Sequence, residues 1–461
     1  MTSRGGNSIQ WSRRSLLKGA GLGAAVAASG PLMAACGSSS PSGSGGSGGS
    51  SGAGKKLTIG SFQDPAMASF RDKYVKQYQQ ETGVKVTYTE TSYNAWYQAC
   101  KSDGLNKTGA YDIYVMDDNW VPEFAAGGIV QSLDKLGLKA NPDILSKGLD
   151  QGYWPPKQGA RLKAFANDTP ELFALVIIDD CNLLYYDKRQ FSSAPKTWDD
   201  IYAAMKAKAK PPKLYGWSAR GVKGNPVVQT YLPFLNSYGG NFCNDDWSPG
   251  FAGPEGVAAL ERLMSFLPYM SPSTPEFDTD QETALLLQGK CMALTEYTGT
   301  AVTEIDNPAD SKVKGLIDIT NTPSQVKPGP AIGTFICGIS SGTSNSEGAV
   351  KFLEWFTSSR IQLQFARGGS AAVTKSALTD SQAVAKYRWL PAIAQSVQSS
   401  TPKPRTPDEP RFEDILGTQL NIALVDALQQ KRNYTQIAQK SLNTAKTQMA
   451  AVLQRNKNIY F

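Results

Sequence analysis

Histidine is absent from the 461 residues of the chain. Imidazole is the general base of Ser-His-Asp and Cys-His catalysis and supplies the HExxH zinc site, so the sequence excludes these chemistries. Two GxSxG matches, at residues 45–49 and 338–342, therefore have no histidine to activate the serine. A GxxxxGKS/T phosphate loop is also missing. We expect no cofactor, no metal site and no catalytic activity.

Cysteine is scarce, and none of the six has the CxxC spacing of zinc and redox motifs. Five cysteines follow Cys36. Because five is odd, at least one of them is unpaired or pairs with another molecule, and the pairing stays open at this point. The five are Cys100, Cys181, Cys243, Cys291 and Cys337.

The chain also lacks long apolar runs, and its excess positive charge is concentrated near the N-terminus. No stretch after residue 36 is long and apolar enough to span a membrane. Four basic residues and no acidic ones lie in residues 1–35, and without them the formal net charge falls from +7 to +3. The basic balance is therefore poor support for a nucleic-acid partner, and we expect none.

Residues 1–35 have the features of an export signal. Ser12–Lys18 resembles a twin-arginine motif, and the Gly- and Ala-rich segment after it is too short and too weakly apolar to span a membrane. Leu32–Cys36 resembles a lipobox, so we expect export by the twin-arginine route and lipidation of Cys36. The alternative is a plain signal peptide cleaved near Ala35.

Residues 36–54 consist of Cys36 and a Gly/Ser tract that cannot bury a core, so they predict a flexible tether. Its reach is about 25 Å if it behaves as a Gly-rich coil. A lipid anchor with such a tether is typical of a protein that works close to the outer face of the cytoplasmic membrane without spanning it.

One stretch near the middle of the chain organises the folded part. An apolar run leads to Asp179 and Asp180, and a short strand, Asn182–Tyr186, follows. Thr197 and Asp200 have the spacing of a capping box, with Asp in place of Glu, and predict the start of a helix.

The region before this stretch predicts a parallel sheet. Leu57–Ser61 and Val84–Thr89 have the composition of strands, and Phe70–Thr82 between them places its aromatic residues near one face of a helix. Gly83 ends that helix. A strand-helix-strand unit implies parallel pairing, and Tyr111–Met116 adds another buried strand.

The region after it is mostly helical. Ser396–Pro407, rich in serine and proline, predicts a crossing between two parts of the fold. The predicted helices are Trp198–Lys208, Pro254–Leu267, Thr283–Gln288, Ser346–Ser358 and a long tail from about Arg411 to Gln454, and the predicted strands are Gly289–Leu294 and Phe335–Ser340.

Three segments resemble the bacterial extracellular solute-binding proteins of family 1, the sugar-binding components of ABC importers: Tyr111–Asp134, Ala174–Asp200 and Gly289–Arg367. In that family a strand ending in Tyr-Asn-Lys crosses from the first lobe to the second, and a Pro-x-Thr-Trp helix start follows. Here Tyr186–Lys188 and Pro195–Asp199 stand at these places.

The resemblance implies an α/β, periplasmic-binding-protein-like fold with two α/β lobes, hinge crossings and a ligand cleft between them. It assigns residues 55–181 with 338–398 to the first lobe and residues 182–337 with 399–461 to the second. The implied protein is a monomer that binds a carbohydrate and delivers it to the permease subunits of an ABC importer.

Ligands of open α/β sheets bind beyond the carboxyl ends of the strands, so the candidate site residues follow predicted strands. The resemblance places an acidic residue at Asp118 and at Asp180, and it implies stacking aromatic residues of the second lobe at Tyr231, Tyr297 and Phe412. Carboxylates accept pairs of sugar hydroxyls, and aromatic rings cover the C–H faces. The predicted ligand-binding residues are Asp118, Asp180, Trp120, Tyr297, Asp117, Glu296, Gln63, Asp64, Tyr231, Phe335 and Phe412.

Other interpretations stay open. The aspartates could be helix caps or solvated loop residues, and Trp120 could belong to the core. A binding protein could take a polyol, a glycerophosphodiester or a polyamine instead of a sugar, and a polyamine would need more carboxylates around aromatic rings. Paired carboxylates such as Asp118 and Asp180 could also belong to a glycosidase of the cell envelope.

Overall fold

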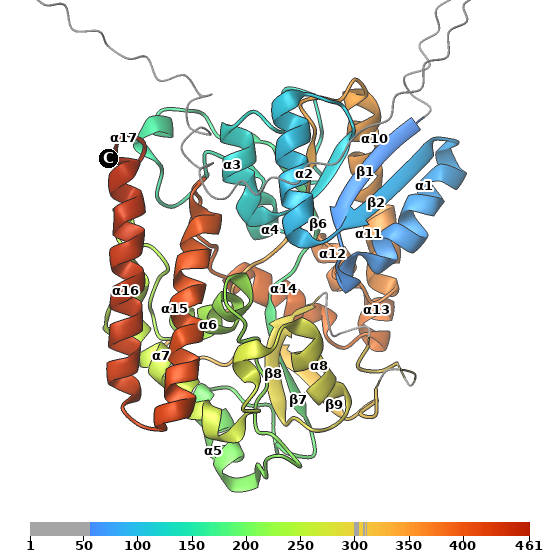
Figure 1. Cartoon of the computed structure of the whole chain (residues 1–461). Helices are drawn as coiled ribbons and strands as arrows, with labels where there is room; N and C mark the ends of the chain where they lie inside the picture. Colours follow the sequence, from blue (N-terminus) through green and yellow to red (C-terminus); the bar gives the residue numbers. More distant parts are fainter. Residues whose placement is uncertain (1–55, 299–303, 308, 310) are drawn as a thin grey trace, which may run out of the picture.

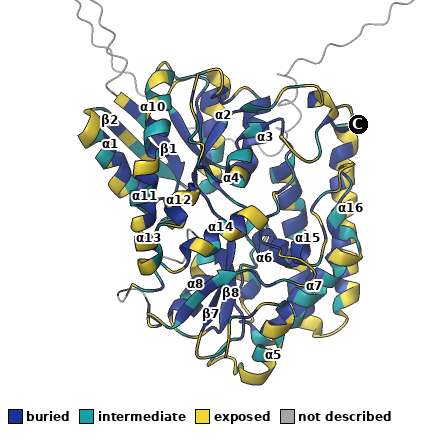
Figure 2. Ribbon diagram, turned by 180° about the vertical axis from the view of Figure 1, so that it is seen from behind, coloured by how far each residue is buried: buried dark blue, intermediate teal, exposed yellow. Residues whose placement is uncertain are grey.

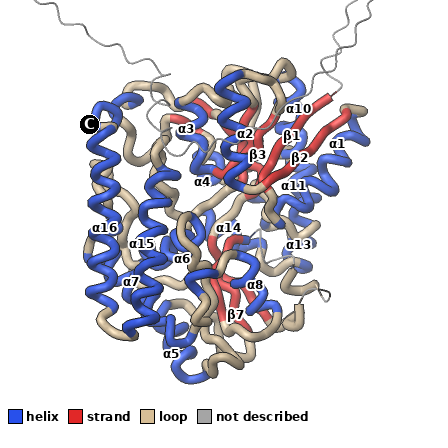
Figure 3. The backbone as a smooth tube through the Cα atoms, viewed as in Figure 1, coloured by secondary structure: helices blue, strands red, loops and turns tan. Residues whose placement is uncertain are grey.

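Two β-sheets, of five and three strands, are each surrounded by helices and form the two halves of the molecule (Figure 1, Figure 3). A third, two-stranded sheet pairs β4 (Tyr153–Trp154) with β5 (Glu171–Leu172). The computed structural model describes residues 56–298, 304–307, 309 and 311–461. The predicted export signal, the lipidated Cys36 and the tether lie outside the described residues.

The larger sheet has the strand order β2-β1-β3-β10-β6. β1 pairs in parallel with β2 and with β3, as the strand-helix-strand unit predicts, whereas β10 runs antiparallel to β3 and β6. Every residue of β6 and four of the five residues of β3 are buried, as expected for strands that helices cover. The strands are β1 (Lys56–Phe62), β2 (Lys85–Thr91), β3 (Ile113–Asp117), β6 (Ala174–Ile178) and β10 (Phe335–Ile339).

Aromatic side chains attach the first predicted helix to this sheet. It begins with a π-helical turn, Phe70–Tyr74, continues as α1 (Val75–Thr82) and ends at Gly83, whose φ of 72° is the left-handed cap that glycine favours. The ring of Phe70 lies 4.8 Å from that of Phe356 on α10. Other helices of this half are α2 (Tyr93–Asn106), α3 (Val121–Ala126), α4 (Ser146–Asp150), α10 (Ser346–Phe356), α11 (Ser359–Arg367), α12 (Lys375–Leu378) and α13 (Ser381–Lys386).

The smaller sheet has the order β8-β7-β9, with β7 (Asn182–Asp187) antiparallel to both neighbours, β8 (Ala293–Tyr297) and β9 (Ile317–Asn321). The prediction of a strand at Gly289–Leu294 was wrong in its bounds, because β8 starts at Ala293. The helix before it, α8 (Thr279–Leu287), also starts earlier than predicted, since Asp278 and Gln281 form a capping box.

Helices complete the second half. The predicted capping box of Thr197 and Asp200 is present at the start of α5 (Trp198–Lys208). The predicted helical tail is divided into two helices that lie side by side (Figure 1), because Lys431 and Asn433 between them take left-handed conformations. These helices are α15 (Glu409–Gln430) and α16 (Tyr434–Arg455), and they contact α6 (Asn225–Ser237) and α7 (Pro254–Phe266).

Burial follows this arrangement. One cluster of buried apolar side chains spans the larger sheet and part of the smaller one, and a second lies among α5, α6, α7, α15 and α16. Exposed residues gather on outward-facing helices such as α1 and α16 (Figure 2). The five cysteines after Cys36 form no disulfide, and all but Cys243 are buried. Among the described residues no helix is both long and apolar enough to cross a membrane.

Three chain segments connect the two halves and run beside one another. Cys181 forms a β-bridge with Ile332, and Ala331 forms one with Thr401, which follows α14 (Leu390–Ser399). The predicted division into lobes stays a prediction, and β10, which pairs with β3 and β6, begins before its boundary at 337/338. In two-lobed proteins, adjacent connecting segments of this kind act as the hinge.

Candidate functional site

The edges of the two sheets that adjoin the crossing segments present most of the predicted site residues. In the larger sheet, Asp117 at the end of β3 lies opposite Phe335 at the start of β10, and Phe335 also lies opposite Ile178 at the end of β6. In the smaller sheet, Asn182 at the start of β7 lies opposite Tyr297 at the end of β8. The residues just beyond these positions therefore meet between the halves.

Asp118 lies at the centre of this region and is only 1% exposed. Its Oδ1 atom has no hydrogen-bond partner among the described residues. Burial, reinforced by the neighbouring Asp117, raises the pKa of Asp118 to about 8. A buried carboxylate oxygen without a donor is costly, so this atom is ready to accept a hydrogen bond from a ligand.

Asp180 holds two chain segments together. Its Oδ1 atom accepts hydrogen bonds from the backbone nitrogens of Cys181, at 2.9 Å, and Thr298, at 2.6 Å, and from the Thr298 hydroxyl. Burial nevertheless raises the pKa of Asp180 to about 7. The side chain thus joins the β6–β7 crossing to the end of β8, a structural role that the sequence did not indicate.

Aromatic rings of the first half lie beside Asp117. The Trp120 indole nitrogen donates to the Tyr93 hydroxyl at 2.9 Å, and that hydroxyl donates to Asp117 Oδ2 at 2.9 Å. Phe62 packs 5.2 Å from the ring of Tyr93 and 5.5 Å from that of Phe335. Trp120 and Phe335 were predicted as site residues, whereas Phe62 and Tyr93 were not.

The second half contributes Glu296 and Tyr297, which lie within β8 and not after it as predicted. Arg220 Nε lies 3.0 Å from Glu296 Oε2, and its guanidinium lies 5.7 Å from the centre of the Tyr297 ring. The Tyr297 hydroxyl donates to Gln229 Oε1 on α6. This side of the site is therefore a tight polar network.

The third crossing and α15 add charged residues that sequence reasoning missed. Lys403 Nζ donates to Glu413 Oε1 at 3.1 Å, and Arg405 donates to the backbone carbonyl of Asp118 at 2.8 Å. The Asn119 amide donates to Glu409 Oε2 at 2.9 Å. The sequence did contain a signal for these residues. Two cations lie inside a Ser/Pro-rich crossing, and two acidic residues four positions apart follow them.

Four predicted residues stand apart from the cluster or at its margin. Tyr231 and Phe412 are fully buried in the core of the second half, and the Tyr231 hydroxyl donates to the carbonyl of Gly256 at 2.8 Å. Gln63 is exposed at the end of β1. Asp64 accepts from the backbone of Ala66 at 2.8 Å, as a cap does, and burial raises its pKa to about 6.

Several further polar atoms are buried at this place without a hydrogen-bond partner among the described residues. Three of them are acceptors or hydroxyls, and one, on Arg405, is a donor. Such atoms need a ligand or water to satisfy them. They are Asn119 Oδ1, Glu409 Oε1, Thr334 Oγ1 and Arg405 Nε. Within the described part of the chain, no group of three or more acidic, cysteine or histidine side chains could hold a metal ion.

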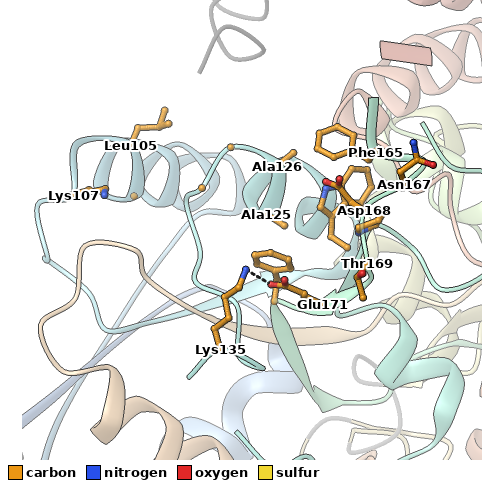
Figure 4. Close-up of a pocket in the computed structure, with 16 residues that line it drawn as sticks. Leu105, Lys107, Ala125, Ala126, Lys135, Phe165, Asn167, Asp168, Thr169 and Glu171 are labelled. Atoms are coloured by element: carbon orange, nitrogen blue, oxygen red, sulfur yellow. Dashed lines mark ion pairs between the residues drawn. The ribbon is translucent and has the colours of Figure 1, made fainter. Parts of the chain in front are cut away.

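Two cavities accompany the site. A cavity of about 140 Å³ adjoins it and is lined by residues 401–405 together with residues 158–160 and 241–245. A larger one, of about 910 Å³, lies at the carboxyl ends of α2 and α3, where Lys135 and Glu171 form an ion pair of 2.8 Å (Figure 4). The larger cavity contains none of the predicted site residues.

Two α-β halves, three adjacent crossings and a buried polar cluster between the halves define the architecture of a solute-binding protein. The model of the bacterial extracellular solute-binding protein family matches residues 63–363, and the chain belongs to this family. The predicted resemblance and the predicted fold are confirmed.

Known proteins of this kind are similar to the chain over most of its length. A probable amino-acid ABC transporter periplasmic-binding protein of Sinorhizobium fredii is 23% identical over 331 residues, which is 70% of this chain and 74% of the relative. The maltotriose-binding protein of Pyrococcus abyssi is 23% identical over 251 residues, 53% of this chain and 50% of the relative. A solute-binding protein of Agrobacterium radiobacter, solved with ribitol, superposes with a TM-score of 0.71 at 24% identity and covers 87% of this chain and 99% of its own.

Proposed function

We propose that the chain is the extracytoplasmic substrate-binding lipoprotein of an ABC importer. It binds a sugar, an oligosaccharide or a polyol between its two lobes and delivers it, as a monomer, to the permease subunits in the membrane. The observation that carries the proposal is the set of buried, unpartnered oxygens around Asp118, which lie beside aromatic rings. Hydroxyl groups supply the missing donors, and ring faces cover sugar C–H surfaces.

The relatives support the carbohydrate class. One is a maltotriose-binding protein, and a structural neighbour was solved with ribitol. The ligands of similar proteins therefore include both linear polyols and oligosaccharides. The Sinorhizobium relative is a probable amino-acid transporter component, which makes a non-sugar solute the second candidate.

Export and anchoring complete the proposal. The twin-arginine-like motif directs export, and Cys36 carries the lipid that holds the protein at the membrane of the permease.

A glycosidase would use one carboxylate as acid and the other as base or nucleophile. Asp180 is poorly suited to either role, because three donors already engage its Oδ1 atom. The proposed protein therefore binds its ligand without turnover.

Native mass spectrometry of the purified protein, followed by calorimetric titration, tests the proposal. The panel contains maltose, maltotriose, ribitol, mannitol, glucosamine, glucamine and amino acids. We expect a sugar or polyol to bind. The bound ligand should remain chemically unchanged during prolonged incubation with the protein. Binding of amino acids alone would contradict the carbohydrate class, and release of product in proportion to protein concentration would contradict the absence of catalysis.

A further inference from the structure

Carboxylates outnumber cations in the polar cluster between the lobes. The members come from the ends of β1 and β3, the crossings, the loop before α6, β8, α8 and α15, and they are buried or half-buried. Since the chain has no histidine, positive charge in the cluster comes from lysine and arginine side chains. The carboxylates are Asp64, Asp117, Asp118, Asp180, Glu282, Glu296, Glu409 and Glu413, and the cations are Arg220, Lys403 and Arg405.

The three cations are already engaged. Lys403 pairs with Glu413 at 3.1 Å, and Arg220 pairs with Glu296 at 3.0 Å. Arg405 directs two guanidinium nitrogens to the backbone carbonyls of Asp118 and Gln151. No ion pair within 4 Å, among the described residues, reaches the carboxylates of Asp64, Asp117, Asp118 or Glu409.

The negative potential persists after these cations are counted. Burial alone would lower the pKa of Lys403, but Glu413 and Asp117, together with Glu409 and Asp118, raise it well above its ordinary value. Asp118 Oδ1 and Glu409 Oε1 also have no hydrogen-bond donor. Both oxygens therefore lack a hydrogen-bond donor, and burial raises the pKa of both carboxyl groups and so favours their protonated forms until a positive charge comes near.

Aromatic side chains lie beside Asp117. Tyr93 donates to Asp117 Oδ2, and its ring lies 4.9 Å from that of Trp120. Carboxylates combined with aromatic rings attract ammonium groups, through ion pairing and through the negative face of the ring.

We propose that the ligand of this cleft is a hydroxylated cation, namely a sugar, polyol or cyclitol that carries a protonated amine. The inference rests on the proposed function and specifies its substrate class. The ammonium group would meet the unpartnered oxygens of Asp118 and Glu409. The hydroxyl groups would serve Asn119 Oδ1 and Thr334, and one hydroxyl oxygen would accept from Arg405 Nε.

Two simpler ligand classes fit less well. A neutral sugar can hydrogen-bond to both carboxyl groups but cannot stabilise their charged forms, which burial disfavours. A polyamine without hydroxyl groups supplies the charge, but an ammonium group has no lone pair for the Arg405 Nε donor. Of these three ligand classes, the one that combines amine and hydroxyl groups satisfies both kinds of atom.

Calorimetric titration with matched pairs tests the inference. The pairs are glucosamine with glucose and glucamine with glucitol, and N-acetylglucosamine and putrescine are added as single probes. In the pair that binds more tightly, we expect the amine to bind at least about tenfold more tightly than the matched compound with a hydroxyl group in its place. The reason is that close buried charge pairs contribute strongly to affinity. Acetylation of the amine should remove the advantage.

Variants locate the effect. Asp118→Asn and Glu409→Gln keep the shape of the side chains and remove charge, so each should reduce the preference for the amine severalfold. Asp426→Asn, on the outer side of the same helix as Glu409 and paired only with exposed Lys440 at 3.8 Å, is the matched control and should leave the preference unchanged.

The outcomes separate the two proposals. If a neutral sugar or polyol binds as tightly as its amine, the inference is wrong and the general binding function is unaffected. If putrescine binds more tightly than every amino sugar, the inference is also wrong and the ligand class is the polyamines. If no sugar or polyol binds, charged or neutral, including the maltotriose and mannitol of the wider panel, the proposed function itself fails and the inference with it.

Discussion

At the scale of single residues, Asp118 and Asp180 differ more than the sequence indicated. Both were predicted to bind a ligand, and both are buried aspartates between the lobes. Asp180 is engaged by Cys181 and Thr298, whereas Asp118 Oδ1 has no partner among the described residues. The two side chains should therefore respond differently to truncation.

Asp118→Ala should weaken ligand binding by about 10- to 150-fold, the value of a hydrogen bond to a charged group, without lowering the stability of the ligand-free protein. Asp180→Ala should lower stability as well, because the Thr298 amide loses its acceptor. Calorimetric titration and thermal melting measure the two effects. Tyr231→Phe is the control: it removes a core hydrogen bond to Gly256 and should leave affinity unchanged. Full affinity in Asp118→Ala would show that the ligand lies elsewhere.

The missing histidine makes the pH dependence of stability informative. In the folded protein the pKa values of Asp64, Asp180 and Asp118 are raised to about 6, about 7 and about 8, mainly by burial. Between about pH 4 and pH 8 the folded state therefore binds more protons than the unfolded state, whose aspartates titrate near 4. Stability should fall as the pH rises through this window.

Thermal melting of the ligand-free protein at pH 5, 6, 7 and 8 measures this effect. The melting temperature should be highest near pH 5 and lower by several degrees at pH 8, and Asp118→Asn should flatten the profile, because it removes the group with the highest of the three values. A melting temperature that rises from pH 5 to pH 8 would contradict the assignment.

At the scale of secondary-structure elements, α15 connects the polar cluster to the core of the second lobe. Its Glu413 accepts from Lys403 and Asn225, at 3.1 Å and 3.0 Å, and from Gln229 at 3.3 Å. Glu413→Ala would leave a buried lysine without its partner and should destabilise the protein by about 3–5 kcal/mol.

Urea unfolding measures this effect, and the same helix offers a control. Asp426 and Lys440 form a surface pair of 3.8 Å in which Lys440 is 75% exposed, so Asp426→Ala should cost at most about 1 kcal/mol. Equal losses in the two variants would mean that the buried network does not stabilise this region.

Elements with local signals were predictable. The capping box at Thr197 fixed the start of α5, and Gly83 fixed the end of α1. The break between α15 and α16 was not predictable, because Lys431 and Asn433 adopt left-handed conformations without a glycine to mark them. Propensity and pattern describe the chain locally, and they do not detect a turn that tertiary packing imposes.

The site was predictable to the same extent. Asp117, Asp118 and Glu296 lie where strands end, and sheet topology brings strand ends together. Arg220 and Lys403 lie in loops far from any strand end in sequence, and only the folded chain places them against Glu296 and Glu413. An argument based on the residues that follow strands therefore could not predict the charge balance in the cleft.

At the scale of the whole molecule, attachment to the membrane depends on residues outside the described part of the chain. If Cys36 carries the lipid, it provides the hydrophobic attachment, because no helix among the described residues could cross a membrane. Cys36→Ala should therefore move the protein from the membrane fraction to the soluble fraction, measured by immunoblotting after fractionation and a salt wash. Retention of the variant in the washed membranes would contradict lipid anchoring.

Closure of the lobes is the motion that the architecture predicts. Three adjacent segments join the lobes. The described structure has the cleft residues in contact across the lobes: Asn119 donates to Glu409, and Arg405 donates to the carbonyl of Asp118. These contacts belong to a closed arrangement, and opening would expose the buried carboxylates to water.

A ligand shifts the balance between open and closed states only by its differential affinity for them. A ligand that neutralises the carboxylates and fills the unpartnered positions around Asp118 binds the closed state better, so saturation should reduce the radius of gyration measured by small-angle scattering. Asn119→Ala removes a contact across the cleft at 2.9 Å and should enlarge the ligand-free protein, with a smaller effect once ligand is bound. An unchanged radius of gyration on saturation, in the parent chain and in this variant alike, would show that binding and lobe movement are uncoupled, and that the buried cluster between the lobes is not where the ligand is held.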